Sequence, residues 1–501
     1  MKKVSTVDAS TGKMVLRNQS KTGRIQNPHY EGANTNRFMN DWVTQNASID
    51  SFLENSLVRL RARASQLVGS DGYADLAEDE VVSNLLGEEG FSLKVNALNK
   101  RGGKDKKAGQ AVKAAWKEFG RAENYSVTKE HTEHEFDSIM LRSIFRKGGA
   151  LARMVEGFPN NGYRFALQGM NMDLLDPEFH DNGRNIQMSV QRDSWGAVSG
   201  YHVLKHHPGD GFRWGAAPGE REFFPADQII HPFLSEEFGQ TQGKPWLTPI
   251  IPRLRQLHAY EEAEVIAARA HASKIFFFET DANSPAGGYS GEGVDEYGNI
   301  KMDGSAGSGE NLPPGVKAHF VDPSHPNSNY PDFRKGMLRG ISAGLVTSYN
   351  ILGQDLEGVS YSSIRSGTLS ERDMWRLLQR WYIEKTKRPV FQRWLKWALL
   401  TGQIEGYDVS DFDRLNHGDF TGRRWEWVDP DKDSKAEERR LKMRLTSHQR
   451  IARKRGEDLE EILDEIAEDN EAAEARQLDL FLDIEGPQPA GAQPEPEDDE
   501  E

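Results

Sequence analysis

Four short motifs contain residue types that could do chemistry. The stretch EHTEHE places His131, His134 and Glu135 close together, and imidazole and carboxylate groups are ligands of zinc. The HExxH pattern is absent, and no third histidine can be argued to converge on this pair. A polar helix start explains the stretch better, so we predict no metal site here.

The other motifs are also incomplete. Ser126 and Lys129 have the SxxK spacing of acyl-serine enzymes without the companion signatures of those enzymes. Asp173 and Asp176 favour a loop over a pair of catalytic carboxylates, and His206-His207 indicates a turn at a strand end. The phosphate-binding pattern GxxxxGK[ST] does not occur, so nothing indicates ATP hydrolysis. We predict a protein that is not an enzyme and has no cofactor.

The composition describes a polar chain with its negative charge at one end. Charged residues make up 28% of the 501 residues and hydrophobic residues 37%, and cysteine is absent, which excludes disulfides and thiol chemistry. Residues 457–501 contain nineteen acidic residues and one basic residue, a net charge of −18, and because the total is −15 the remaining 456 residues carry about +3. Such a body is not suited to tight, sequence-specific DNA binding, but it is compatible with a conduit that touches DNA weakly. We expect no membrane insertion and a cytoplasmic chain, because neither an apolar run of about 18 residues nor an apolar leader is present.

The first half of the chain has an α+β pattern. Residues 1–45 are polar and predict an extended arm that gains order only against a neighbour. Apolar residues at three- and four-residue steps from Ile49 to Val68 predict a helix, with Arg59, Arg61 and Arg63 mostly on its solvated face. More helices are expected before Gly87 and over residues 133–145, followed by strand-like segments up to residue 231.

Two helices then flank a long excursion rich in glycine and serine. The first is predicted over residues 248–274 and the second from Asp332 onward. In the second helix Gly336, Gly340 and Gly344 recur every four residues, and each costs roughly 1 kcal/mol of helix propensity against alanine. We interpret this face as one that another backbone approaches closely, such as a copy of the same helix.

The C-terminal part is mostly helical. A long segment from Ile364 to Leu400 should be kinked or broken at Pro389. Its four tryptophans could stack on bases, but core or subunit packing is the interpretation that we favour for them; they are Trp375, Trp381, Trp394 and Trp397. Residues 430–470 predict one or two more helices, first basic and then acidic, and the tail GPQPAGAQPEPEDDEE has a disordered composition.

Taken in order, these segments resemble the lambda-type family of phage portal proteins, from about Trp42 to Leu480. The most specific match is FFPADQIIHPFLSEEFGQTQGKPWLTPIIPRL, which has the expected residues Pro225, Ala226, Ile230, His231, Gln240, Gly243, Pro245 and Trp246. One position departs from the family: an arginine usually precedes the Gly-x-Pro-Trp motif, and this chain has Gln242. Any salt bridge that relatives make at this position is therefore in doubt here.

The resemblance implies an α+β portal fold with a wing, stem helices, a clip, a tunnel loop and a helical crown, assembled as a ring around an axial channel. The implied division of the chain is an N-terminal arm (1–45), the first half of the wing (46–247), the first stem helix (248–274), the clip (275–330), the second stem helix (331–349), the tunnel loop (350–362), the second half of the wing with a long kinked helix (363–428), the crown (429–480) and a disordered acidic tail (481–501).

The resemblance also implies which residues meet DNA. The tunnel loop would place Gln354, Asp355, Leu356, Glu357 and Gly358 nearest the duplex. Small, acidic and amide side chains there would keep phosphate contacts weak, which suits sliding. On the second stem helix, Arg334, Lys335 and Arg339 would face the channel, the solvent or a neighbouring subunit, and the glycine face would pack against the neighbour's stem helix.

The function implied by the resemblance is a ring of about twelve subunits at one vertex of the capsid. This ring would conduct double-stranded DNA nonspecifically during packaging and ejection, and it would be a docking platform for the large terminase subunit and the head-tail connector proteins. Major capsid and scaffolding proteins would be further partners, in the virion and, during assembly, in the host cytoplasm. The alternative is a head-assembly or adaptor protein without a DNA channel; the order of helix, clip and helix weighs against it.

Overall fold

The computed structural model describes residues 3–7, 14–18, 46–210, 219–272, 276–280, 316–320, 328–357, 361–425, 430–455 and 459–476. It divides into two units, residues 1–52 and 53–501. In the first unit, β1 (Lys3–Val7) and β2 (Met14–Asn18) form an antiparallel hairpin. The two strands therefore pair with each other, whereas the sequence predicted an extended arm ordered only by a neighbour.

Helices follow the hairpin along the chain. The single helix predicted from Ile49 to Val68 is interrupted, and α1 (Ile49–Glu54) is followed by α2 (Leu57–Ser70). The side chain of Asp71 caps α3 (Gly72–Leu85) by accepting hydrogen bonds from the amides of Tyr73 and Ala74. The other helices of this region are α4 (Lys106–Phe119), α5 (Ala122–Tyr125) and α6 (Glu133–Lys147), and the last confirms the helix predicted over 133–145.

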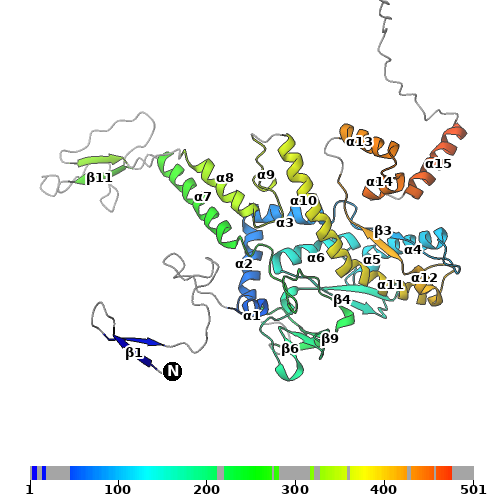
Figure 1. The fold of residues 1–501 in the computed structure, drawn as a ribbon, viewed down its shortest axis with the longest axis horizontal. Coiled ribbons are helices and arrows are strands. Elements are labelled where there is room, and N and C mark those ends of the chain that lie inside the picture. Colours follow the sequence, from blue (N-terminus) through cyan, green and yellow to red (C-terminus); the bar gives the residue numbers. More distant parts are fainter. Residues whose placement is uncertain are drawn as a thin grey trace, which may run out of the picture. The chain divides into compact units, whose positions relative to one another are not determined.

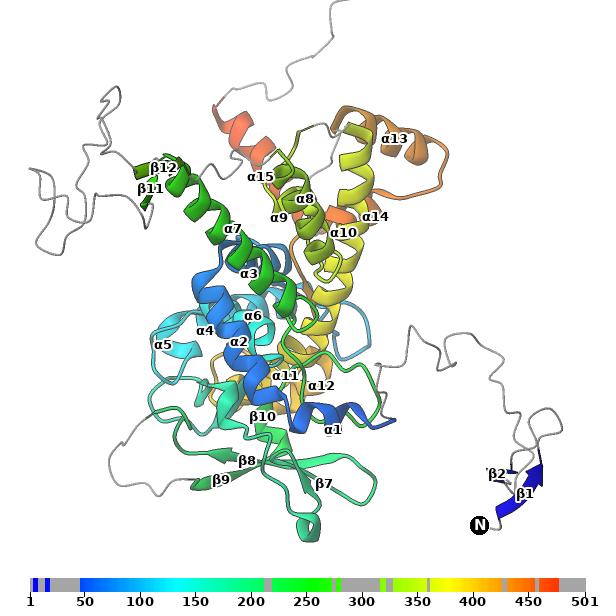
Figure 2. The same ribbon diagram turned by 90° about the vertical axis from the view of Figure 1, so that its left-hand side faces the viewer.

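Antiparallel sheets lie against these helices. A three-stranded sheet has the order β10-β4-β5 and a four-stranded sheet the order β6-β7-β8-β9, of which Figure 2 shows β7, β8 and β9. Their strands are β4 (Leu151–Glu156), β5 (Phe165–Met170), β6 (Ile186–Gln187), β7 (Val190–Arg192), β8 (Val198–Leu204), β9 (Arg221–Pro225) and β10 (Ile229–Ile230). The mixture of helices and sheets agrees with the predicted α+β class.

Two helices come next in the predicted order, with a hairpin between them in the sequence that was not predicted. Figure 1 shows α7 (Ile251–Ala272) beside α8 (Tyr330–Ser342). Strands β11 (Phe276–Thr280) and β12 (Val316–Phe320) pair antiparallel between them in the sequence, while most of the excursion around these strands lies outside the described residues. The predicted second stem helix is too long by several residues, because α8 ends at Ser342 and a short helix, α9 (Tyr349–Leu352), begins after a turn.

The long C-terminal helix is interrupted just before Pro389. It consists of α10 (Tyr361–Tyr382), one π-helical stretch (Ile383–Lys387) and α11 (Arg388–Leu400). Proline lacks the amide proton that an interior helical position needs, and the π-helical stretch absorbs the irregularity. The remaining elements are β3 (Ser92–Val95) paired with β13 (Gly418–Thr421), α12 (Phe412–Leu415), α13 (Pro430–Lys442), α14 (His448–Arg455) and α15 (Leu459–Arg476).

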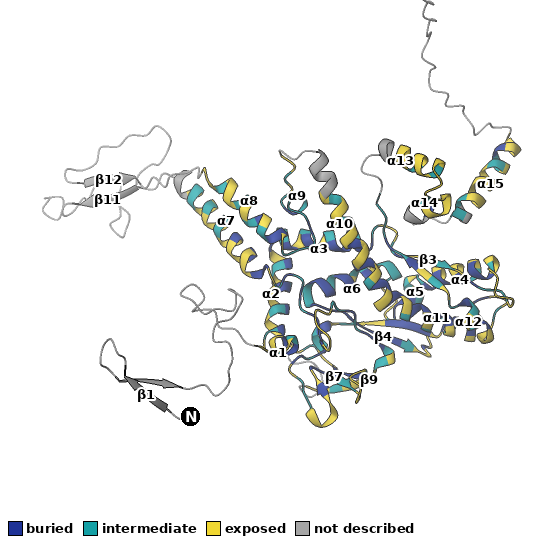
Figure 3. Cartoon of the chain, in the orientation of Figure 1, coloured by how far each residue is buried: buried dark blue, intermediate teal, exposed yellow. Residues whose placement is uncertain are grey.

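The core forms where α4, α6, α11 and the β4-β5 sheet meet (Figure 3). Trp394 is fully buried, and its ring lies 4.9 Å from that of Trp116 in an edge-to-face arrangement. Trp375 is also buried, and Trp381 and Trp397 are partly buried against the same cluster. The predicted packing role of these tryptophans is therefore confirmed, in place of a stacking platform for bases.

One charged cluster is buried in this core. The amino group of Lys387, with no exposed side-chain surface, lies 2.7 Å from the carboxylate of Asp137 and 2.5 Å from that of Glu133. Burial opposes the charge on Lys387, but the two carboxylates outweigh it and hold the pKa of this lysine well above its ordinary value. The cluster joins the π-helical stretch to α6 and so ties the interruption of the long helix to the core.

Candidate functional site

The helix pair α7 and α8 carries the predicted glycine face, and most of that face is turned toward the same chain. A Cβ atom added at Gly340 would overlap Nη1 of Arg253, and one added at Gly344 would overlap Cγ2 of Ile250. At Gly336, no atom lies within 4 Å of an added Cβ. The sequence predicted the close approach of another backbone, such as a copy of the same helix, but at Gly340 and Gly344 the nearest atoms beyond the local turn are side chains of the same chain, and Gly336 is open. Gly344 lies outside α8.

Arg334 joins three helices. Its Nε donates a hydrogen bond of 3.0 Å to the hydroxyl of Tyr73 in α3 and lies 3.3 Å from the carboxylate of Glu261 in α7. The Tyr73 hydroxyl in turn donates to Glu261 at 3.0 Å. The Arg334 guanidinium is thus engaged within its own subunit, and it positions α8 against α7 and α3.

Lys335 contacts the loop that comes after α8 and α9. Its amino group lies 3.3 Å from the carboxylate of Asp355 and 3.8 Å from that of Glu357. The hydroxyl of Tyr349 donates to Asp355 at 2.6 Å, and the amide of Glu357 donates to the same carboxylate at 3.0 Å. The hydrogen bond from Tyr349 contributes most to lowering the pKa of Asp355, followed by the Glu357 amide and Lys335. Asp355 is therefore an anchor of the loop.

The tip of this loop is exposed. Leu356 is 68% exposed and the side chain of Glu357 is 87% exposed. Gln354 has a positive φ of 49°. Its side-chain Nε2 donates a hydrogen bond of 3.0 Å to the backbone carbonyl of Ile351, so this side chain closes the turn. The guanidinium of Arg339 lies 5.2 Å from the centre of the Tyr349 ring, a cation–π contact.

The structure thus brings five of the predicted stem and tunnel-loop residues together, and these residues make different contacts. Lys335, Asp355 and Glu357 form a charged cluster, Gln354 shapes the turn, and Leu356 and Glu357 are the side chains left for an outside partner. Gly358 lies outside the described residues.

Sequence reasoning missed a buried polar centre at Arg61. This side chain, predicted on a solvated face, is 2% exposed. Its Nη2 donates to Oε1 of Gln242 at 2.7 Å, and its Nε donates to the carbonyl of Lys147 at 2.9 Å. Gln242 has no exposed surface and donates to the carbonyl of Met188 at 2.8 Å. Burial lowers the pKa of Arg61 to about 10, against the opposing effect of Asp173.

The departure at Gln242 was the signal that could have revealed this centre. The resemblance implies an arginine at this position, and in this chain the Gln242 amide instead accepts a hydrogen bond from Arg61. Asp173 adds to the centre by pairing with Lys147 at 2.5 Å and with His207 at 3.3 Å. The carboxylate of Asp173 thus has a structural use, and that of Asp176 pairs with Arg221 at 2.5 Å.

The other motifs also use their polar atoms locally. Glu135 completes a capping box with Thr132 at the start of α6, and His134 contacts the carbonyl of Gly87 at 2.9 Å, which agrees with the predicted polar helix start. The Ser126 hydroxyl bonds Thr128, whereas Lys129 donates to the carbonyl of Asn160. Within the described part of the chain, no group of three or more potential metal ligands gathers.

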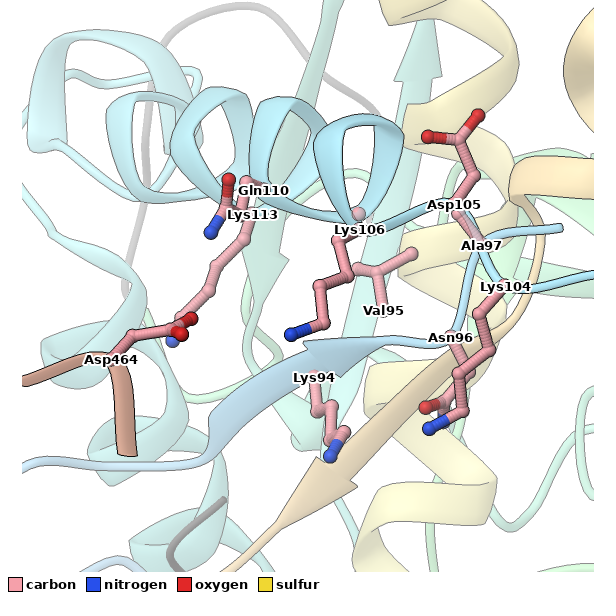
Figure 4. Close-up of a pocket in the computed structure, with 11 residues that line it drawn as sticks. Lys94, Val95, Asn96, Ala97, Lys104, Asp105, Lys106, Gln110, Lys113 and Asp464 are labelled. Atoms are coloured by element: carbon pink, nitrogen blue, oxygen red, sulfur yellow. The ribbon is translucent and has the colours of Figure 1, made fainter. Parts of the chain in front are cut away.

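A small lysine-lined cavity of about 80 Å³ lies between β3 and α4. Its lysines come from the β3–α4 region, and Asp464 of α15 lies at its edge (Figure 4). The lysines are Lys94, Lys104, Lys106 and Lys113. One carboxylate of the acidic helix thus lies beside lysines of its own chain.

Comparison with known proteins decides the family. Residues 35–379 match the model described as "Phage portal protein, lambda family". The chain belongs to the lambda family of phage portal proteins. This portal protein is 30% identical over 451 residues to the probable portal protein of Halomonas phage phiHAP-1, covering 88% of this chain and 86% of that relative. It is 22% identical over 480 residues to portal protein B of Escherichia phage lambda, covering 87% of each chain.

Solved structures of gene transfer agent (GTA) particles also resemble this portal protein. A chain of the native GTA virion matches with a TM-score of 0.43 and 12% identity, covering 81% of this chain and 93% of the other. A chain of the native GTA neck with C12 symmetry has the same TM-score, identity and coverage.

Among the described helices of this portal protein, none is both long and apolar enough to cross a membrane.

Proposed function

We propose that this portal protein assembles into a ring of about twelve subunits at one vertex of the phage head. Double-stranded DNA passes through the axial channel during packaging and ejection, without base-specific contacts. The outer faces of the ring dock the large terminase subunit and the head-tail connector proteins, and its rim meets the major capsid and scaffolding proteins. Its place is the virion, after assembly in the host cytoplasm.

The observation that carries this proposal is the order of elements between residues 251 and 382. Helix α7, a β-hairpin, helix α8, the short helix α9 with its loop and the long helix α10 succeed one another in a chain of the portal family. We assign α7 and α8 to the stem, the hairpin to the clip, residues 350–362 to the tunnel loop and α13 to α15 to the crown. The wing then consists of α2 to α6 with the sheets, together with α10 and α11.

The chemistry of the loop supports its assignment to the channel. Among the described residues of the loop, the exposed side chains are those of Gln354, Leu356 and Glu357, and none of them carries a positive charge that would hold a phosphate group. Lys335, a cation beside the loop, is already paired with Asp355 and Glu357. A duplex that passes such a loop meets a surface that is weakly repulsive and smooth, so translocation by one base pair does not require breaking a strong ion pair.

Negative-stain electron microscopy of the full-length, untagged protein tests this proposal. We expect rings of about twelve subunits with an open centre about as wide as a DNA duplex. A monomer or a closed dimer would contradict ring assembly. Closed rings without an axial hole would instead favour the head-assembly or adaptor function.

A further inference from the structure

A basic groove lies between α10, the β13 region and the C-terminal helices. It encloses about 1050 Å³, and its first lining residue along the chain is Leu369, beyond the tunnel loop. Its lining contains eight arginines, namely Arg372, Arg376, Arg380, Arg388, Arg424, Arg440, Arg450 and Arg455. Three acidic residues share this lining, Glu384, Asp419 and Glu437, so the groove has an excess of five positive charges.

Much of this positive charge is not balanced by the described residues. Arg376 pairs with Asp373 and Arg388 with Glu384, at 2.8 and 3.3 Å. Among the residues that the structure describes, no ion pair is formed by Arg380, Arg424, Arg440 or Arg450. Like charges that face one another across a groove repel, and an anion that enters it relieves this repulsion.

Arg424 shows the imbalance most directly. Its Nε is buried and has no hydrogen-bond acceptor among the described residues. Burial, followed by the charge of nearby Arg376, lowers the pKa of Arg424. Two guanidinium groups lie over the ring of Trp425. The Cζ atoms of Arg372 and Arg376 are 5.9 and 5.8 Å from the centre of this ring. The groove is therefore built to receive carboxylate or phosphate groups.

The acidic C-terminal segment of this chain has the matching charge. Residues 486–501 carry six acidic residues and no basic one. The preceding acidic helix, α15, contributes Asp464 to the lysine-lined cavity and no residue to the lining of the arginine groove. The proline- and glycine-rich sequence GPQPAGAQP has little helical propensity and suits an extended peptide in a groove.

The length of the chain allows this contact. Arg455 lines the groove, and α15 begins four residues later, at Leu459. The start of α15 is therefore at most about 14 Å from Arg455. The 18 residues of α15 span about 27 Å. The next 18 residues, 477–494, can reach about 60 Å when extended, which exceeds the sum of the two distances. The acidic residues at the end of the chain can therefore return to the groove.

We propose that residues 486–501 bind in the arginine groove formed by α10, the β13 region and α13 to α14, as an electrostatic strap. The strap neutralises the groove and keeps the phosphate groups of DNA out of it. It goes beyond the channel function, because the groove is separate from the tunnel loop and the proposal holds whether or not a ring forms.

Site-directed crosslinking in the full-length chain tests the strap. The natural chain has no cysteine, so the pair Ala436→Cys and Gln493→Cys provides the only two thiols. Ala436 lies in the groove lining. With a short bismaleimide we expect at least a fivefold higher crosslinking yield than for the control pair Ala197→Cys and Gln493→Cys, in which Ala197 is exposed on a loop away from the groove.

Charge reversal shows whether the arginines cause the contact. The triple variant Arg380→Glu, Arg440→Glu and Arg450→Glu should reduce the crosslinking yield to that of the control pair, and about 0.5 M salt should reduce it as well because salt screens exposed charges. The matched variant Arg59→Glu, Arg63→Glu and Lys117→Glu makes the same charge change on exposed positions elsewhere and should leave the yield unchanged. Unchanged circular dichroism of both variants shows that they fold.

Two results would overturn the strap. Equal yields for the groove pair and the control pair would mean that residues 486–501 do not occupy the groove. If a short DNA duplex binds the intact chain, loses its binding in the triple glutamate variant, and no crosslink forms at Ala436, then DNA and not the C-terminal segment occupies the groove.

Discussion

At the scale of single residues, Arg61 should contribute more to stability than any other arginine of α2. In the Arg61→Ala variant, two acceptors lose their hydrogen-bond donor: the backbone carbonyl of Lys147 and the buried Oε1 of Gln242. We expect it to lower the free energy of unfolding by about 3 kcal/mol, and Arg63→Ala, an exposed neighbour, to change it by less than about 0.5 kcal/mol. Thermal unfolding followed by circular dichroism measures both, and equal midpoints would contradict the buried role.

His231 predicts how stability depends on pH. Burial, followed by the charge of Arg61, lowers the pKa of His231 from 6.5 to about 3. The folded state therefore keeps this imidazole neutral, while the unfolded state takes up a proton below pH 6.5. The stability that depends on the neutral imidazole is fully present above this pH and falls by about 1.4 kcal/mol per pH unit as the pH drops toward the folded-state pKa. In chemical denaturation at about pH 7, 6 and 5, His231→Asn should lose less stability over this range than the natural chain; parallel losses would show that another group titrates.

Residue patterns predicted some of these roles and missed others. The capping box at Thr132 and Glu135 is local, so sequence alone could identify a helix start there. The three arginines of α2 look alike along the sequence, and only the approach of Gln242 from 181 residues away decides that Arg61 is buried. Long-range contacts of this kind are set by tertiary packing and leave little trace in a local pattern.

At the scale of elements, Gly344 and Gly336 in the α8 region should respond differently to substitution by alanine. Gly344→Ala places a methyl group against Cγ2 of the buried Ile250, and we expect a loss of about 1–3 kcal/mol from overpacking. Gly336→Ala meets no atom within 4 Å and should stabilise α8 in the isolated subunit by about 1 kcal/mol. Thermal unfolding of the unassembled subunit compares the two, and the same sign for both would contradict the packing seen at Ile250.

The helix end in this region shows why element boundaries resist prediction. Residues 343–349 have helix-compatible side chains, so periodicity extended the helix to Tyr349. In the folded chain, however, the side chains of Pro249 and Ile250 lie against Gly344, and the amide of Ser348 donates to the carboxylate of Glu371 in α10. These contacts favour a turn and a new short helix over continuation. The break at Pro389 was predictable because proline acts within its own helix.

At the scale of the whole molecule, the order of elements could be predicted because the family motifs and the glycine-rich excursion fix it along the chain. The charge distribution could also be predicted, since it is a property of composition. The arginine groove could not, because its eight arginines come from α10, α11, the β13 region, α13 and α14. Only the folded chain brings them together.

In the assembled ring, a change of charge at Glu357 gives the strongest test of the proposed DNA channel. In a ring of about twelve subunits, Glu357→Lys turns a circle of negative charges into a circle of positive ones around the duplex. Each lysine can pair with a phosphate, so translocation must break these pairs repeatedly, and we expect intact rings with DNA packaging slowed at least about tenfold. Glu357→Gln removes charge without adding a phosphate ligand and should slow packaging far less. Higher salt should partly restore the lysine variant and not the natural protein, because screening weakens phosphate contacts. Variants that no longer form rings would instead show that the loop holds the subunits together.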